Sequence, residues 1–341
     1  MNDPSLRESV AVLGAGTWGS ALAGILTGKG HDVRAWDIDA QIIRRLRETR
    51  THPRLPGFRL GEAARLTTNL AEAVEGARVI LIAVPSGAVR ATAQALAESR
   101  ADGRAEAWLI CSKGMDPETL KPLHEVLEEV LGAEIRGGAA ALGGPSHAEE
   151  VVQGVPTTVV AAAPQAELRR RIQRMLFLPR FRVYTHDDLL GVELGGALKN
   201  VIAIAAGVSD GQGFGDNTRA ALITRGLAEI LRLGVKMGAR AETFMGLSGL
   251  GDVVVTCTSR HSRNHRFGEL LAAGRSAEAA LAEVGMVVEG YAATRCAIGL
   301  ARRHEVEMPL AAAVHAMLFE GLTVGDALEG LLAREARSEA D

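Results

Sequence analysis

The stretch VAVLGAGTWG, residues 10–19, runs from an apolar, β-branched segment into a glycine-rich turn, and a stretch with helical spacing follows from Ser20 to Thr27. In a strand–turn–helix unit, Gly14 permits the tight turn, Gly16 lets the backbone approach a pyrophosphate, and Gly19 lets helix and strand pack closely. The pattern therefore predicts a dinucleotide-binding unit, with the phosphates held at the N-terminus of the helix.

Short apolar runs and helical stretches alternate from this unit to about residue 185. The runs are nearly continuous in apolar residues, which is typical of strands covered by helices on both faces of a parallel sheet. We therefore predict an α/β domain of the Rossmann type with a doubly wound parallel sheet. The candidate strands are Val10–Leu13, Val33–Trp36, Ala64–Thr67, Val79–Val84, Ala107–Cys111, Ala139–Leu142, Thr157–Ala161 and Arg182–Tyr184.

The second half of the chain has a different sequence pattern. Strand patterns nearly vanish after about residue 187, and long stretches rich in Ala, Leu and Gly predict helices at Leu189–Val208, Asn217–Met237 and Ala277–His304. We predict a dinucleotide-binding domain over residues 1–189 and an all-α substrate-binding domain over residues 190–341. No flexible linker marks the boundary, so we expect a tight interface that contains a cleft.

Composition argues against several classes of function. The 341 residues carry 38 Lys and Arg against 41 Asp and Glu, a net charge of −3, so no overall positive field would attract nucleic acid. The chain does not open with a signal-like segment and has no apolar run of roughly 18 residues, so we expect neither secretion nor membrane insertion. Three widely spaced cysteines exclude a cysteine zinc site and favour the cytoplasm.

An acidic residue follows the second predicted strand. Asp37 lies at about the distance from the glycines that is expected of a residue binding the adenosine ribose. Its carboxylate would repel a 2′-phosphate, which favours NAD over NADP, although Arg44 and Arg45 are close enough to soften that preference. An alternative is that Asp37 only caps the following helix.

Three later strands also end in loops that suit ligand binding. These loops contain Pro85, Lys113, and the pair Gly144 and Ser146. Because ligands bind at the carboxyl ends of strands in open α/β sheets, we expect all three loops to face one crevice. Lys113 is then a candidate ligand for an anion or a carbonyl group.

The helical half begins with a lysine in an apolar setting. Lys199 lies in the segment ALKNVI, where burial would disfavour its ammonium form and bring its pKa toward the range useful for proton transfer. Asn200 beside it could bind the same small ligand. Asp252, in a glycine-rich segment, could orient the ammonium group of Lys199. The alternative is a lysine whose head reaches solvent from a core helix.

A basic segment follows Asp252. Ser262, Arg263 and Asn264, with Arg260 and Arg266 close by, predict an anion site, strengthened if a helix begins there. The alternative is a solvated basic loop. His261 and His265 have a spacing that can bind zinc, but the surrounding arginines oppose a dication, so we predict no metal.

Together these motifs resemble one family, the NAD(P)-dependent glycerol-3-phosphate dehydrogenases of the soluble bacterial biosynthetic type. The similarity covers nearly the whole chain, and its most specific segments are ELGGALKNVIAIAAGVSDG from Glu193 and TCTSRHSRN from Thr256. The resemblance implies a helical half like the C-terminal domain of 6-phosphogluconate dehydrogenase, a homodimer, and reversible reduction of dihydroxyacetone phosphate to sn-glycerol 3-phosphate with NAD(H) or NADP(H) for phospholipid synthesis.

The resemblance also implies roles for individual residues. Lys199 would be the proton donor and acceptor, and Lys113, Asn200 and Asp252 would hold the substrate and orient that lysine. The substrate phosphate would lie at Ser262, Arg263 and Asn264, near Gly144 and Ser146. The cofactor contacts implied in this way, together with the glycines and strand ends above, are Gly14, Gly16, Thr17, Trp18, Gly19, Asp37, Pro85, Lys113, Ala148, Arg263, Val287 and Glu289.

The chain departs from the family pattern at two positions. His147 stands where an aromatic residue such as phenylalanine is expected, and Asp37 stands where many bacterial members carry a basic or neutral residue. Two other functions remain as alternatives. One is a dehydrogenase of similar build that acts on a β-hydroxy acid, and the other is a catalytically silent NAD(H)-binding regulator.

Overall fold

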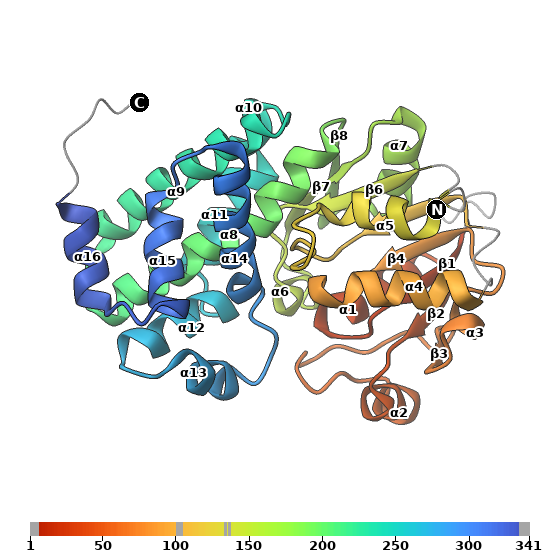
Figure 1. The fold of residues 1–341 in the computed structure, drawn as a ribbon. Helices are drawn as coiled ribbons and strands as arrows, with labels where there is room; N and C mark the ends of the chain where they lie inside the picture. The colour runs from red at the N-terminus through yellow and green to blue at the C-terminus, as the bar shows by residue number, and fades with distance from the viewer. Residues whose placement is uncertain (1–6, 100–104, 133–134, 136–137, 334–341) are drawn as a thin grey trace.

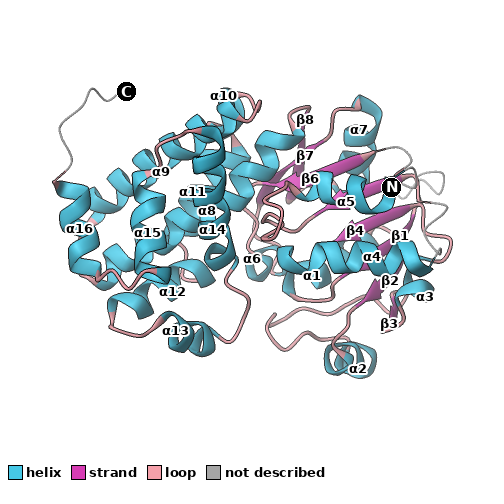
Figure 2. Cartoon of the chain, viewed as in Figure 1, coloured by secondary structure: helices cyan, strands magenta, loops and turns pink. Residues whose placement is uncertain are grey.

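The computed structural model describes residues 7–99, 105–132, 135 and 138–333. The first six residues, on which the expectation about secretion partly rests, lie outside these ranges. A mixed α/β half is followed by an all-helical half (Figures 1 and 2), as the sequence predicts. The strands are β1 (Ser9–Leu13), β2 (Asp32–Trp36), β3 (Arg65–Thr67), β4 (Val79–Ile82), β5 (Ala107–Ile110), β6 (Ala139–Gly143), β7 (Thr157–Ala162) and β8 (Phe181–His186).

The helices differ in length between the two halves. Those of the α/β half are α1 (Thr17–Gly28), α2 (Ala40–Thr49), α3 (Leu70–Val74), the 3-10 turn η2 (Ser86–Ala88), α4 (Val89–Ser99), α5 (Leu123–Leu131), α6 (Ala148–Val152) and α7 (Ala166–Leu176). Those of the helical half are α8 (Leu189–Gly211), α9 (Asp216–Lys236), α10 (Ala241–Phe244), the π-helical turn η4 (Leu247–Gly251), α11 (Asp252–Thr258), α12 (Arg263–Ala272), α13 (Ala277–Val284), α14 (Glu289–His304), α15 (Pro309–Phe319) and α16 (Val324–Leu332).

The sheet is doubly wound. Its strand order is β3-β2-β1-β4-β5-β6-β7-β8, so the order reverses between β1 and β4. Side chains of β1 alternate between two cores: Val10 and Val12 pack on one face, whereas Ala11 and Leu13 pack on the other. Both faces are buried, which explains why the strands read as continuous apolar runs. The point of reversal is where open α/β sheets place their ligand crevice.

The predicted doubly wound sheet is parallel except at one pairing. Strand β7 pairs antiparallel with β6, and β8 is parallel to β7. The connection from β6 contains only the five-residue helix α6, which stays at the carboxyl edge of the sheet. Because the chain does not cross back over the sheet, the next strand begins at that edge and runs in the opposite direction.

Helix α8 is the core of the second half. By length and composition it could cross a membrane, a property that the sequence analysis did not recognise. However, 94% of its most apolar window is buried inside the protein, against the helices that surround it. Such burial is expected of a core helix, because an all-round apolar helix must be covered by protein or lipid.

The predicted helix Ala277–His304 is two helices. Gly285 has a φ of 61° and ends α13 in the left-handed conformation, a common helix stop. The chain then runs through Met286 to Val288 before α14 begins at Glu289. The break matters for function because it brings Val287 and Glu289 to a cleft between the two halves.

The glycine-rich turn after β1 is tightly packed. Gly14 has a φ of +102°, which L side chains rarely adopt. A Cβ atom on Gly19 would lie 1.7 Å from the carbonyl oxygen of Gly14. The roles that the sequence predicts for these two glycines, a tight turn and close helix–strand contact, are therefore confirmed.

We predict that Gly19→Ala destabilises the α/β half by about 3 kcal/mol or more, since the added methyl group meets backbone that cannot move aside. The midpoint of urea denaturation would measure the loss. Gly28→Ala, in the same helix but with open space around the added atom, is the matched control and should leave the free energy of unfolding within about 1 kcal/mol of the wild-type value. Equal midpoints for the two variants would contradict the packing argument.

Candidate active site

A cleft of about 1000 Å³ lies between the sheet and the helical half. It collects residues from both halves of the chain, as expected from the absence of a linker. The predicted site residues that line it are Gly14, Gly16, Thr17, Trp18, Asp37, Pro85, Lys113, Ser146, Ala148, Lys199, Asn200, Ser262, Arg263, Asn264, Val287 and Glu289. The remaining three, Gly19, Gly144 and Asp252, do not line it, but Gly144 and Asp252 bond directly to residues that do.

One end of the cleft suits a dinucleotide. Gly16 is the N-cap residue of α1, and no side chain caps the first N–H groups of that helix. A Cβ atom on Gly16 would have nothing within 4 Å, so the backbone here faces open space. Free N–H groups and the helix dipole favour an anion at this position. The local geometry therefore fits a pyrophosphate.

Asp37 holds the glycine-rich turn in place. Its Oδ2 accepts a hydrogen bond from the N–H of Ala15 at 2.7 Å, and its Oδ1 accepts one from Asp39 at 2.9 Å. The alternative that Asp37 caps α2 is wrong, because Asp39 is the capping residue and accepts from the N–H of Gln41. Arg45 lines the cleft near Asp37, whereas Arg44 lines a separate small hollow.

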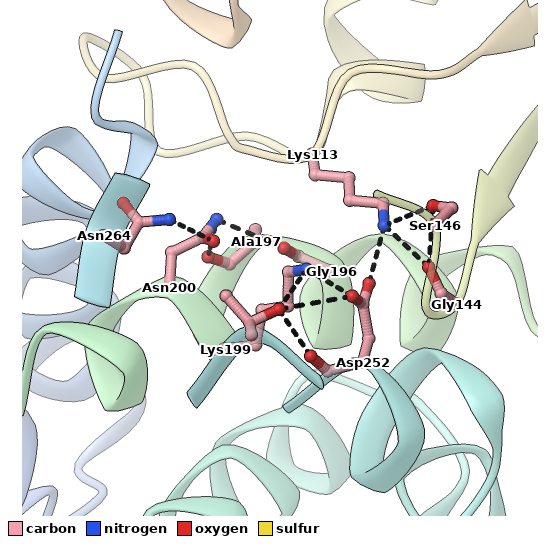
Figure 3. Close-up of polar contacts among 10 residues, drawn as sticks. Lys113, Gly144, Ser146, Gly196, Ala197, Lys199, Asn200, Asp252 and Asn264 are labelled. Carbon is pink, nitrogen blue, oxygen red and sulfur yellow. Dashed lines mark hydrogen bonds and ion pairs between the residues drawn. The ribbon is translucent and has the colours of Figure 1, made fainter. Parts of the chain in front are cut away.

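The centre of the cleft contains two lysines joined by one carboxylate. Asp252 Oδ2 accepts from Lys113 Nζ at 2.9 Å, and Asp252 Oδ1 accepts from Lys199 Nζ (Figure 3). Lys113 also donates to Gly144 O at 2.7 Å and to Ser146 Oγ at 3.0 Å. An ammonium group has three N–H donors, so all those of Lys113 are used.

Lys199 is held differently from Lys113. Besides Asp252 it donates to Thr256 Oγ1 at 2.8 Å, which leaves one of its three donors for a ligand. Only 6% of Lys199 is exposed, and the residue lines the cleft. The alternative of a lysine that reaches solvent from a core helix is therefore wrong.

Glycines bring Asp252 to this lysine. A Cβ atom on Gly195 of α8 would lie 2.5 Å from Ser248 O in the π-helical turn η4. The missing side chain lets η4 approach α8 closely, and Asp252 follows η4 as the first residue of α11. π-Helical turns often occur at functional sites, where they redirect the residue that follows.

The buried charges change one another's proton affinity. Burial, helped by the positive charge of Lys113, lowers the pKa of Lys199 to about 8, although Asp252 opposes this change. Burial alone would raise the pKa of Asp252, but Lys113 and Lys199 hold it below its usual value. Asp252 is therefore a carboxylate at neutral pH, and Lys199 is poised to exchange a proton in that range.

Two asparagines connect three helices beside Lys199. Asn264 Nδ2 donates to Asn200 Oδ1 at 2.8 Å, and Asn264 Oδ1 accepts from the N–H of Gly290 at 2.8 Å. Asn200 Nδ2 faces the carbonyl of Ala197 at 3.2 Å. These bonds fix both amide groups at the wall of the cleft, where Asn264 retains a second N–H.

The predicted anion site is smaller than expected. A helix does begin here, with Ser262 as its N-cap, and Arg263 lies exposed at the cleft with one bond to Val287 O at 3.2 Å. Arg266 turns away to Glu269 and Glu283, and Arg260 does not line the cleft. The alternative of a solvated basic loop therefore holds for Arg260, whereas Arg266 lies on α12 and pairs with acidic side chains away from the cleft.

The histidines of this segment do not form a metal pair. His265 Nε2 contacts Asp210 Oδ2 at 2.8 Å, while His261 lines the cleft. Among the residues that the structure describes, no group of three or more His, Cys, Asp or Glu side chains could hold a metal ion.

Glu289 connects the helical half to the end of β4. Its Oε1 accepts from the N–H of Ser86 at 3.0 Å and its Oε2 accepts from the Ser86 hydroxyl. Burial raises the pKa of Glu289, although these bonds from Ser86 oppose the increase. The carboxylate thus ties the loop that contains Pro85 to α14 at the cleft.

Thr256 and His147 line the cleft in addition to the predicted site residues. Thr256 bonds Lys199, and its spacing of four residues from Asp252 on one helix could have revealed that both face the lysine. His147 lines the cleft with its ring centroid 5.9 Å from that of His261. Only tertiary contact between α6 and the start of α12 brings these two rings together.

The fold and the site together define a class of protein, the two-domain, dinucleotide-dependent dehydrogenases. The doubly wound sheet has the glycine-rich turn of this class, and the far wall of the cleft has a buried lysine. Comparison with known proteins identifies the family within this class. Residues 9–169 match the N-terminal domain of the NAD-dependent glycerol-3-phosphate dehydrogenases, and residues 188–329 match the C-terminal domain.

Full-length relatives agree with these matches. A glycerol-3-phosphate dehydrogenase (NAD(P)+) of Moorella thermoacetica is 48% identical over 337 residues, which cover 98% of this chain and 99% of the relative. Its counterpart in Bacillus subtilis is 44% identical over 335 residues, 98% of this chain and 96% of that protein. The crystal structure of glycerol-3-phosphate dehydrogenase from Coxiella burnetii, 38% identical, superposes with a TM-score of 0.91 over 96% of this chain and all of that one. The chain belongs to the NAD-dependent glycerol-3-phosphate dehydrogenase family.

We predict that Gly16→Ala weakens NADH binding about tenfold, because the methyl group enters the open space that a pyrophosphate would need. The loss of stability should be no more than about 1 kcal/mol, the cost of alanine in place of glycine at a helix N-cap. Fluorescence titration with NADH would measure the dissociation constant, and the thermal midpoint would report stability. Gly28→Ala is again the control and should bind NADH as the wild type does. Unchanged NADH affinity in Gly16→Ala would place the pyrophosphate elsewhere.

Proposed function

We propose that this protein catalyses the reversible reduction of dihydroxyacetone phosphate to sn-glycerol 3-phosphate with NADH or NADPH, in support of glycerophospholipid synthesis. The observation that carries the proposal is Lys199, buried at the cleft with one free donor and a pKa of about 8. Membership of the family favours this reaction over the alternative of a β-hydroxy acid dehydrogenase.

The cofactor would lie along the glycine-rich turn. Gly14, Gly16 and the first N–H groups of α1 would hold the pyrophosphate, and the open space beside Gly16 fits it. The further contacts that we propose are Thr17, Trp18, Asp37, Pro85, Lys113, Ala148, Arg263, Val287 and Glu289, with Gly19 supporting the turn. When bound, the nicotinamide supplies the hydride that reduces the substrate carbonyl.

The protein's own residues bind the substrate and move its proton. Arg263, with Ser262 and Asn264, offers donors for the phosphate at one wall of the cleft. The free N–H of Lys199 would hydrogen-bond the carbonyl oxygen and transfer a proton to it as negative charge develops.

The neighbours of Lys199 act through position and charge. Asp252 and Thr256 fix its ammonium group, and Lys113, held by Gly144 and Ser146, lowers its proton affinity. Asn200 supports the same wall through its bond to Asn264. In the reverse reaction the neutral amine of Lys199 would accept the hydroxyl proton of glycerol 3-phosphate.

The choice of coenzyme depends on Asp37. Its carboxylate lines the cleft and is fixed by two backbone N–H groups. A fixed negative charge repels a 2′-phosphate, so we propose a modest preference for NADH, which Arg45 on the same cleft would limit.

We also infer a cytoplasmic homodimer joined through the helical half, as the family resemblance implies. Three free, buried cysteines suit a reducing compartment. We propose no role for nucleic acid, in keeping with the net charge of −3.

The first experiment compares initial rates of dihydroxyacetone phosphate reduction with NADH and NADPH, for the wild type and Lys199→Ala. We expect faster turnover with NADH, and a loss of about 10²–10⁴-fold in kcat for the variant, because a general acid contributes that much. Retained NADH binding is the control for folding. Binding of NADH by the wild type without any turnover would support a silent regulator instead.

The pKa of Lys199 predicts opposite pH profiles for the two directions. Reduction needs the ammonium form, so its kcat/KM should stay level below pH about 8 and fall about tenfold per pH unit above it. Oxidation needs the amine, so its kcat/KM should fall about tenfold per unit below that pH. Rates measured from pH 7 to 9.5 would test the position of the break. Because each turnover consumes or releases one proton, the two profiles must diverge whichever group carries it, so a break far from pH 8 in both directions is the result that would exclude Lys199 as the proton carrier.

A further inference from the structure

We infer that His147 recognises the free hydroxyl group of the substrate through its Nε2 atom, and so distinguishes dihydroxyacetone phosphate from analogues that lack this hydroxyl. The inference deepens the proposed function and rests on it. The observation behind it is that His147 Nε2 is buried and has no hydrogen-bond partner among the described residues.

His147 occupies a fixed position at the cleft. Its backbone caps α6, where its carbonyl accepts hydrogen bonds from the N–H groups of Glu150 and Val151. Its ring lies 5.9 Å from that of His261, centroid to centroid, across the two halves. Yet its Nε2 is buried and has no hydrogen-bond partner in the described part of the chain. Since a buried polar atom costs free energy unless it is paired, a ligand is the natural partner.

The available donors point to one part of the substrate. A three-carbon keto-phosphate presents a phosphate, a carbonyl oxygen and a hydroxyl group. The proposed phosphate contacts and the free N–H of Lys199 account for the first two. Lys113, which shares the carboxylate of Asp252 with Lys199, already uses all three of its N–H donors. We assign the hydroxyl to His147, because its Nε2 is a buried polar atom that no described residue satisfies.

The charge of the imidazole suits a neutral partner. Burial, with the positive charges of Lys199 and Lys113, lowers the pKa of His147 to about 4; Asp252 opposes this change and His261 adds to it. The ring is therefore neutral at physiological pH and does not compete with Lys199 for the proton. A hydroxyl can both donate and accept, so it can pair with Nε2 in either tautomer, whereas phenylalanine at this position offers no such atom.

The test compares two ligands that differ by one hydroxyl group. We would measure the KM of dihydroxyacetone phosphate and the competitive inhibition constant of hydroxyacetone phosphate, which lacks the hydroxyl, for the wild type and His147→Phe. We expect the KM to rise about tenfold and the inhibition constant to stay within about twofold. The KM of NADH should not change, and His147→Gln, which retains polar atoms, should recover part of the lost affinity.

Controls separate recognition from folding. His315→Phe replaces a histidine of α15 that contacts Glu320 and does not line the cleft, so it should change neither constant. If His147→Phe does not fold, His147→Ala provides the same comparison between ligands.

Three results would overturn the inference: an unchanged KM of dihydroxyacetone phosphate, an equal loss of affinity for both ligands, or a rise in the KM of NADH instead. Failure of the proposed function would be visible separately, because the wild type itself would then not oxidise NADH with dihydroxyacetone phosphate.

Discussion

The site depends on one buried carboxylate shared by two ammonium groups, of which that of Lys199 is buried and that of Lys113 is partly buried. Asp252 lies between Lys113, from the α/β half, and Lys199, from the helical half. Removing charges from water is costly, and that cost is offset only when each charge has close partners of opposite sign and satisfied hydrogen bonds. Lys113, with three bonds, meets this condition. Lys199 has only two such bonds, so one N–H donor stays unpaired. This donor and the lowered pKa make Lys199 available for proton transfer.

The same contact helps to hold the two halves together. Two further contacts act with it. Ser86 donates two hydrogen bonds to Glu289, and the backbone N–H and the ring of His124 on α5 contact the carboxylate of Glu193 on α8. Each of these interactions joins a residue of the α/β half to a residue of the helical half. The cleft is therefore bounded by polar contacts on several sides, and substrate and cofactor would meet between two surfaces whose relative position these contacts fix.

The differences between sequence-based expectation and structure have local physical causes. The direction of β7 depends on α6 staying at the cleft edge, and a run of apolar letters contains no information about strand direction. The spacing does not reveal the break at Gly285, because helical spacing continues on both sides of it. The sequence allows Asp37 as a helix cap, but Asp39 two residues later fills that position, and Asp37 instead supports the glycine-rich turn.

The sequence by itself determined the fold class, the glycine-rich turn, the family and the residue types of the site. These follow from local patterns: buried strands read as apolar runs, a tight turn requires glycine, and a lysine inside an apolar helix predicts a perturbed amine. Tertiary structure alone decided which charges are paired, that Thr256 holds Lys199, that Arg260 and Arg266 turn away, and that His147 keeps an unpaired nitrogen at the cleft. Hydrogen bonding and burial depend on neighbours that are distant in the chain, so residue spacing cannot specify them.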